Sequence, residues 1–139
     1  IYTSLLDDGA VPRLVGTQLG KIQASDKSVL YVEITLEAGP SVLYDAVVVP
    51  DAEAAVASLA RDAHALDFVR EQYRHCKPIL AVGASDQLLT ACGIDPALPD
   101  GQPDPGVITT ADATTATEGF IAAIAKHRHY ARETDPPRV

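Results

Sequence analysis

Two short, wholly apolar segments constrain the fold of this chain more than any other feature. The first covers residues 46–49 and is closed by Pro50; the second covers residues 79–82 and is closed by Gly83. A helical pattern follows each of them. Strands without polar residues on either face are typical of parallel sheets that helices cover on both sides. The sequence therefore predicts an α/β fold, a three-layer sandwich around a mostly parallel sheet.

The other elements alternate around these two strands. Strands are expected at 11–16 and 107–109, and residues 21–24 and 29–32 predict a small β-excursion. The proline-rich residues 95–106 predict a loop, and residues 135–139 a tail. The helices are expected at the start of the chain up to Gly9, at 52–59 with Asp51 as N-cap, and at 62–76, 85–93 and 115–132.

The chain begins inside its first helix. In a doubly wound fold a strand precedes that helix and lies near the middle of the sheet, so the sequence predicts one domain over 1–139 that lacks its first strand. Four or five buried apolar side chains of a central strand contribute about 6–15 kcal/mol, the whole stability of a typical domain. We therefore expect a neighbouring chain or a retained peptide to supply the strand, or the fragment to rearrange or swap into an oligomer.

Charge and composition exclude several classes of partner. The net charge of −8, from 11 basic and 19 acidic residues, opposes binding to nucleic acid and to anionic membranes. Apolar runs of a handful of residues predict neither a membrane span nor a signal peptide. Two cysteines are too few for a disulfide framework and favour a reducing, cytoplasmic location. A C-terminal basic cluster is either a solvated helix face or a docking surface for an acidic partner: Lys126, Arg128, Arg132 and Arg138.

Residues 79–89 have the strand, sharp turn and helix of a nucleophile elbow. The tip of this turn falls at Gly83 or Ala84, which offer no nucleophile. Ser85 lies one or two places later and is predicted to cap the following helix, while Asp86 complements the helix dipole in the first turn. The elbow is therefore expected to be chemically empty.

No other pattern predicts a reactive or metal-binding group. Cys92 lies at a helix C-terminus, where the dipole disfavours a thiolate, so a packed thiol is expected. No glycine-rich phosphate loop is present. The four histidines lack zinc-site spacing and are predicted to be surface or partly packed side chains: His64, His75, His127 and His129. The sequence thus predicts no catalytic, cofactor-binding or metal-ligating residue.

Four segments taken together point to a known family: residues 14–22, 40–50, 65–79 and the closing helix with Lys126-His127-Arg128. They resemble the C-terminal domain of large-subunit haem catalases over essentially the whole chain. The phrase around Tyr73, His75, Lys77 and Pro78 is the most specific part. That domain belongs to the flavodoxin-like, class I glutamine amidotransferase-like superfamily, together with intracellular proteases and deglycase-like proteins.

The resemblance implies that the catalytic groups of the superfamily are missing. The Cys and His of active members fall at about Gly83 and Ala84, and the paired glycines that help hold an oxyanion fall at Asp51 and Ala52. A negative side chain beside a developing oxyanion would oppose the reaction. The acidic partner of the nucleophile follows the first strand, which is absent here.

What the resemblance implies about function concerns a longer parent protein. There a separate β-barrel domain binds haem and converts hydrogen peroxide to water and oxygen. This chain is expected to carry no cofactor, to contact the haem domain of the same polypeptide and to support a homotetramer as a non-catalytic accessory domain. Two alternatives stay open: a free-standing protease- or deglycase-like hydrolase that uses Cys92 or Ser85, and a holdase-like chaperone domain.

Overall fold

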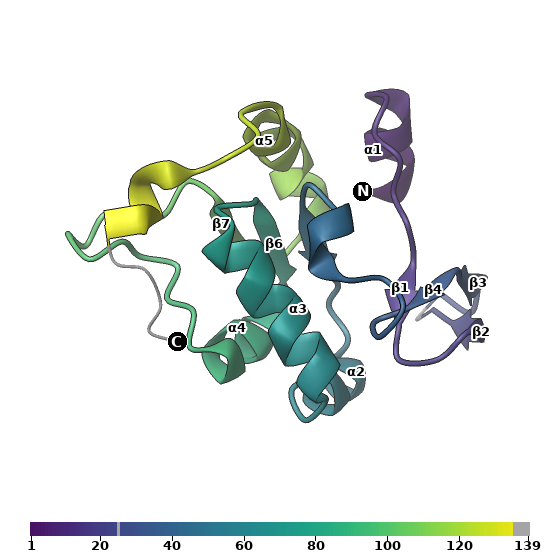
Figure 1. Ribbon diagram of the computed structural model, residues 1–139. Coiled ribbons are helices and arrows are strands. Elements are labelled where there is room, and N and C mark those ends of the chain that lie inside the picture. Colours follow the sequence, from purple (N-terminus) through teal and green to yellow (C-terminus); the bar gives the residue numbers. More distant parts are fainter. Residues whose placement is uncertain (25, 135–139) are drawn as a thin grey trace.

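The computed structural model describes residues 1–24 and 26–134, and a parallel sheet lies at its centre (Figure 1). The strand β6 (Ile79–Val82) lies in the middle of this sheet, between β5 (Val47–Val49) and β7 (Val107–Thr110). Helices cover both faces of the sheet, which confirms the predicted α/β sandwich. They are α1 (Tyr2–Asp7), α2 (Glu53–Leu59), α3 (Ala63–Arg74), α4 (Asp86–Cys92) and α5 (Ala113–Ala125).

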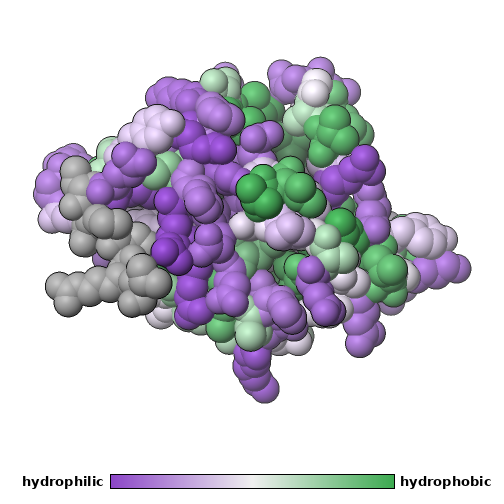
Figure 2. Space-filling view, in the orientation of Figure 1, coloured by the Kyte–Doolittle hydropathy of each residue, from purple (hydrophilic) through white to green (hydrophobic). Residues whose placement is uncertain are grey.

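The N-terminal third forms two small sheets apart from the central one. Only residues 15–16 of the strand expected at 11–16 pair, as β1 (Val15–Gly16), in parallel with β4 (Ile34–Thr35). The expected β-excursion is an antiparallel hairpin of β2 (Gly20–Gln23) and β3 (Val29–Val32). The space-filling view shows hydrophobic surface over α1 and this hairpin (Figure 2).

The outer edge of β5 is open among the residues that the structure describes. This strand pairs with β6 alone, and neither small sheet continues the central sheet at that edge. The predicted absence of a first strand from this domain stays a prediction. The supply of that strand by another chain, a peptide or a swapped copy stays a prediction.

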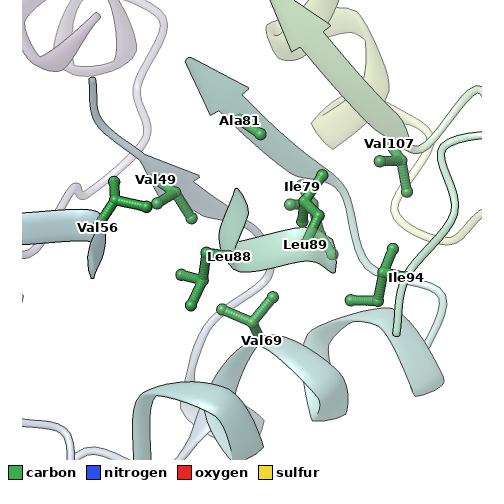
Figure 3. Close-up of a cluster of buried hydrophobic side chains, with 9 residues drawn as sticks. All are labelled: Val49, Val56, Val69, Ile79, Ala81, Leu88, Leu89, Ile94 and Val107. Atoms are coloured by element: carbon green, nitrogen blue, oxygen red, sulfur yellow. The ribbon is translucent and has the colours of Figure 1, made fainter. Parts of the chain in front are cut away.

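Side chains of the central strands alternate between two cores, one on each face of the sheet. Ile79 and Ala81 of β6 enter the core beneath α2, α3 and α4, whereas Leu80 and Val82 enter the core beneath α1 and α5. This is the period of two expected for a strand covered on both sides. Each fully buried Ile, Leu or Val contributes about 1.5–3 kcal/mol. Figure 3 shows the first core: Val49, Val56, Val69, Ile79, Ala81, Leu88, Leu89, Ile94 and Val107.

The helices depart from the sequence predictions mainly at their ends. The helix expected over 62–76 ends at Arg74, and Cys76 takes a left-handed conformation with φ +56°. The helix expected over 115–132 is α5, which ends at Ala125 before a left-handed turn at His127, and residues 130–134 form a separate 3₁₀ helix, η3 (Tyr130–Thr134). The tail expected at 135–139 lies outside the described residues.

Candidate functional site

The turn that follows β6 has the backbone of an elbow without its reactive group. The short 3₁₀ helix η2 (Gly83–Ser85) joins β6 directly to α4, and Gly83 has φ +56°. Side chains avoid this left-handed region, at a cost of about 1–2 kcal/mol per residue. A Cβ atom at Gly83 would also lie only 2.5 and 2.6 Å from the carboxylate oxygens of Asp51. The tip of the turn therefore has no room for a side chain, because the Asp51 carboxylate occupies that space.

The Asp51 carboxylate occupies the anion-binding position of the elbow. Asp51 follows β5, and its Oδ1 accepts a hydrogen bond of 3.0 Å from the backbone N–H of Ala84. In working elbows the N–H of the residue after the nucleophile helps to stabilise the oxyanion. Here that donor is paired with a carboxylate, which would also repel a developing negative charge. The prediction that Asp51 caps α2 is wrong, because the N-cap residue is Ala52 and makes no side-chain cap.

Ser85 is a structural hydroxyl rather than a nucleophile. Its side chain is fully buried, and Oγ lies 3.0 Å from the carbonyl of Val49 and 2.8 Å from that of Val82. Since both carbonyls can only accept, the hydroxyl proton is shared between the ends of β5 and β6. Ser85 is the N-cap residue of α4, as predicted, but its side chain makes no capping hydrogen bond. Asp86 does occupy the first turn of α4, as predicted.

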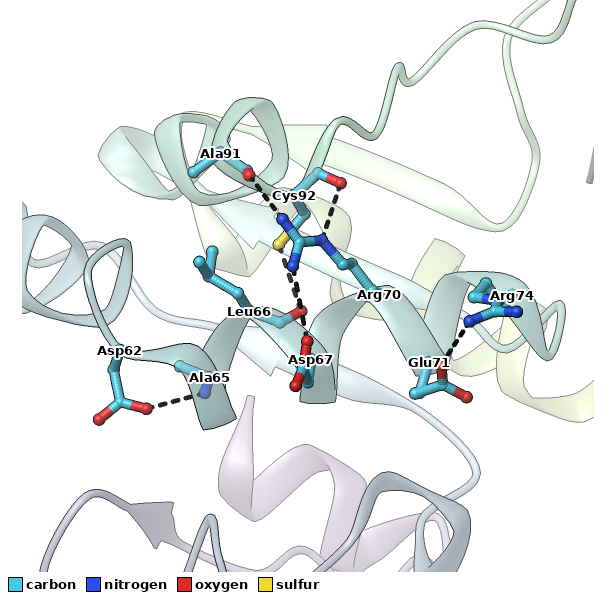
Figure 4. A network of polar contacts seen from close by, with 9 residues as sticks. All are labelled: Asp62, Ala65, Leu66, Asp67, Arg70, Glu71, Arg74, Ala91 and Cys92. Atoms are coloured by element: carbon cyan, nitrogen blue, oxygen red, sulfur yellow. Dashed lines mark hydrogen bonds and ion pairs between the residues drawn. The ribbon is translucent and has the colours of Figure 1, made fainter. Parts of the chain in front are cut away.

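Cys92 is a packed thiol held in its protonated form. It ends α4, and its Sγ lies 3.6 Å from the carbonyl of Leu66 on α3. Burial raises the pKa of this thiol to about 11, although the positive charge of Arg70 opposes the shift. Arg70 instead donates to the last carbonyls of α4, at 3.3 Å from both Ala91 O and Cys92 O (Figure 4). Neither residue of the hydrolase alternative, Cys92 or Ser85, is thus activated.

The histidines occupy unrelated positions. His64 and His127 are exposed, and His75 Nε2 lies 3.3 Å from Glu71 on the same helix. His129 is buried, contrary to the expectation of a surface or partly packed side chain, and its Nε2 donates to the carbonyl of Ala123 at 3.1 Å. In the part of the chain that the structure describes, no three His, Cys, Asp or Glu side chains are placed to hold a metal ion.

Of the predicted C-terminal basic cluster, Arg138 lies outside the described residues, and the others do not share one exposed surface. Lys126 is exposed, but Arg132 is buried, with its Nε 2.8 Å from Oδ2 of the equally buried Asp104. Arg132 also donates to the carbonyls of Tyr73 and Lys77, and its guanidinium lies 4.5 Å from the centre of the Tyr73 ring. The reading of this cluster as a solvated helix face is wrong for Arg132, which fixes η3 to the end of α3.

A second buried cation is Lys77, which the sequence marks as part of the family phrase but not as a buried group. Its Nζ donates to the carbonyls of Ser41 and Tyr44 at 2.9 and 2.6 Å, and burial lowers its pKa. The Gln72 amide donates to the carbonyl of Ser41 as well, at 2.7 Å. These bonds hold the 3₁₀ helix η1 (Ser41–Leu43) against α3. Arg132 and Lys77 therefore serve architecture rather than ligand binding.

The cavity between α1 and α5 offers no ligand for haem iron. Protein ligands to haem iron are His, Cys, Met or Tyr side chains that face the cofactor cavity. A cavity of about 290 Å³ lies between α1 and α5, but apolar residues such as Leu5, Ile121 and Ile124 line it, and Asp8 is its one charged neighbour. None of these residue types is a haem ligand.

Comparison with known proteins decides the family. A family model described as the C-terminal domain found in long catalases matches residues 1–134. The chain belongs to this family. Catalase HPII of Mycobacterium avium is 38% identical over 96% of the chain, and Catalase C of Rhizobium meliloti (strain 1021) is 39% identical over 86% of it. The chain spans only 20% and 16% of these two relatives.

A solved structure supports the fold of this catalase C-terminal domain. A two-domain protein of Anabaena variabilis, with DJ-1/ThiJ/PfpI-like and ferritin-like domains, matches with a TM-score of 0.71. The match has 17% sequence identity and covers 88% of this chain and 41% of the other. At this identity the likeness concerns the fold alone. It confirms the flavodoxin-like α/β sandwich.

Proposed function

We propose that this domain is a non-catalytic accessory unit of a longer catalase polypeptide. In this proposal a separate domain binds haem and converts hydrogen peroxide to water and oxygen, and the present domain stabilises the polypeptide and its homo-oligomer in the cytoplasm. The observation that carries the non-catalytic part is the Asp51 carboxylate on the N–H of Ala84. A site whose oxyanion donor is bound to an anion cannot stabilise an acyl-transfer transition state.

Three further observations support the proposal. Both thiols, Cys76 and Cys92, are free, and burial raises the pKa of each. This suits a structural role in a reducing compartment. Within residues 1–24 and 26–134, no helix has the length and apolar character needed to cross a bilayer. The relatives that share this domain are named catalases, and the domain is a small fraction of each.

The proposal is tested by removing the domain from its parent polypeptide. Peroxide turnover per haem should stay within about twofold at low temperature, because the chemistry lies elsewhere. The temperature at which the oligomer dissociates should fall, measured by size-exclusion chromatography and light scattering. Residues 1–139 alone should show no haem absorbance and no peroxide decomposition. Unchanged thermal stability after deletion, or turnover by the isolated domain, would contradict the proposal.

The alternatives are tested on the isolated domain. Ester and glyoxal-adduct hydrolysis by residues 1–139 should stay at the buffer rate, and Cys92→Ala and Ser85→Ala should leave that rate unchanged. Light scattering of an aggregating client protein should not decrease when the domain is added. Hydrolysis that disappears with Cys92→Ala or Ser85→Ala would establish the hydrolase instead, and suppressed aggregation would favour the chaperone.

A further inference from the structure

An apolar surface of the N-terminal third has no partner within the described residues. Its members are large hydrophobic side chains of α1, of the segments flanking β1 and of the β2–β3 hairpin, which we call the apolar flank. Eight of the eleven exposed large hydrophobic side chains lie here: Tyr2, Leu6, Val11, Leu19, Ile22, Val29, Leu30 and Tyr31. Figure 2 shows hydrophobic surface in the half of the view that holds α1 and the hairpin.

The hairpin itself is insufficiently supported by the rest of the domain. Every residue of β2 and β3 is exposed except Val32, which packs its methyl groups against Gly16. A two-stranded hairpin with no covering layer is at best marginally stable in water. Among the described residues each of its strands pairs with the other strand alone, and natural proteins normally cover or charge such sheet edges. The hairpin is therefore built as if another surface completes it.

The charge of this region differs from that of the rest of the chain. Residues 1–35, which contain the whole flank, hold three basic and four acidic residues, a net charge of −1, so the remaining residues carry −7 of the total of −8. Lys21 lies 5.8 Å from the centre of the Tyr31 ring across the hairpin. Interfaces favour aromatic and apolar cores with few acidic groups. The flank meets these conditions, whereas the strongly acidic remainder of the surface opposes close association.

The length of the relatives indicates what covers the flank. This domain makes up only 16–20% of the two catalases described above, so about four-fifths of such a polypeptide lies outside it. A covalently tethered surface meets the flank at an effective concentration in the millimolar range, which a second copy in solution does not reach. If a tethered surface and a second copy have the same intrinsic affinity for the flank, the tethered surface therefore occupies it.

We propose that the apolar flank is the surface through which this domain docks onto the remainder of its own catalase polypeptide. The proposal rests on the accessory function above and adds the location of the contact. The receiving surface has an apolar centre that covers both faces of the hairpin and an acidic rim opposite Lys21 and Lys27. Standard interfaces bury about 800 Å² per partner around such a centre.

Hydrogen exchange tests the docking surface without any mutation. Relative to the amides of β6 in the same sample, the amides of residues 19–24 and 26–32 should exchange at least tenfold more slowly in the full catalase polypeptide than in isolated residues 1–139. Equal exchange in both would overturn the proposal. Protection that develops in the isolated domain as its concentration rises, without protection in dilute full polypeptide, would overturn it too, because the occupant would then be a second copy.

A matched pair of substitutions separates the flank from exposed apolar residues in general. Val29 in the flank is 53% exposed and Val42 outside it is 70% exposed, so Val29→Lys and Val42→Lys should both leave isolated 1–139 folded. In the full polypeptide Val29→Lys should abolish the protection of residues 19–32, and Val42→Lys should not. Equal effects would overturn the docking surface. The accessory function would survive that result if deletion of the domain still lowers oligomer stability.

Discussion

A double-mutant cycle at the elbow tests whether Asp51 occupies the place of a nucleophile. Gly83→Ala imposes a side chain at φ +56° and moves the Asp51 carboxylate away from the N–H of Ala84. The backbone strain costs about 1–2 kcal/mol. The lost hydrogen bond, which joins a charged acceptor to a neutral donor at an exposed position, costs about 1 kcal/mol. We expect Gly83→Ala to destabilise the domain by about 2–3 kcal/mol.

The second substitution, Asp51→Ala, removes the carboxylate and its hydrogen bond, at a cost of about 1 kcal/mol. In that background Gly83→Ala has no carboxylate to displace, so only the backbone strain of about 1–2 kcal/mol remains. The double variant should therefore be about 1 kcal/mol more stable than the sum of the two single effects. This difference exceeds the roughly 0.3–0.5 kcal/mol within which independent sites are additive.

Urea unfolding followed by circular dichroism measures each corner of the cycle, with the slope of the transition checked for constancy. Gly93 provides the matched control, because it also has a left-handed backbone, at φ +72°, but nothing lies within 4 Å of a Cβ built there. Gly93→Ala and Asp51→Ala should be additive. If Gly83→Ala and Asp51→Ala were additive as well, the Asp51 carboxylate would not be what fills the elbow.

Two more outcomes follow from buried groups. Asp104→Asn leaves the buried Arg132 without a counter-ion, so it should lower the free energy of unfolding in urea by about 3–5 kcal/mol. Asp100→Asn, at an exposed position of the same loop, should lower it by under about 0.5 kcal/mol. The raised pKa of Cys92, about 11, predicts slow alkylation of the native protein at pH 7.5 and fast alkylation in urea. The Cys92 thiol ionises at a lower pH in the unfolded chain than in the folded protein. The free energy of unfolding should therefore be constant below about pH 8.5 and decrease as the pH rises toward 11. Rapid native labelling at pH 7.5 would refute this assignment.

The sheet and the vacant elbow could be predicted from the sequence because residue identity alone decides them. Four consecutive apolar residues at 79–82 fit only a position covered on both faces, and a glycine at the tip cannot be a nucleophile. The hydrogen-bond partner of Asp51, however, could not have been predicted. Capping preferences predict that Asp51 bonds to its own helix, but its carboxylate accepts from the N–H of Ala84, 33 residues away, next to the paired strands β5 and β6.

The C-terminal segment escaped prediction for a similar reason. Charged residues at 126–132 are typical of a solvated helix face, and local propensity alone would continue α5. Tertiary bonds compete with that continuation: the N–H of His129 donates to the carbonyl of Cys76, and Arg132 donates to Tyr73 and Lys77. The recognisable phrase at residues 73–78 is therefore where η1, α3 and η3 are fixed together. These contacts give the phrase a structural role, and no catalytic role is needed to account for it.

The elbow illustrates how a fold can hold the backbone geometry of a site without the groups that react in it. Gly83 still makes the sharp turn that joins β6 to α4, and Ser85 still ties the ends of β5 and β6 through their carbonyls. Both tasks concern the stability of the sheet, so they persist without a substrate. A working site would also leave an N–H free for an oxyanion. Here that donor, the N–H of Ala84, is paired with Asp51. Backbone geometry of this kind therefore identifies the fold, and only the groups placed on it decide whether it reacts.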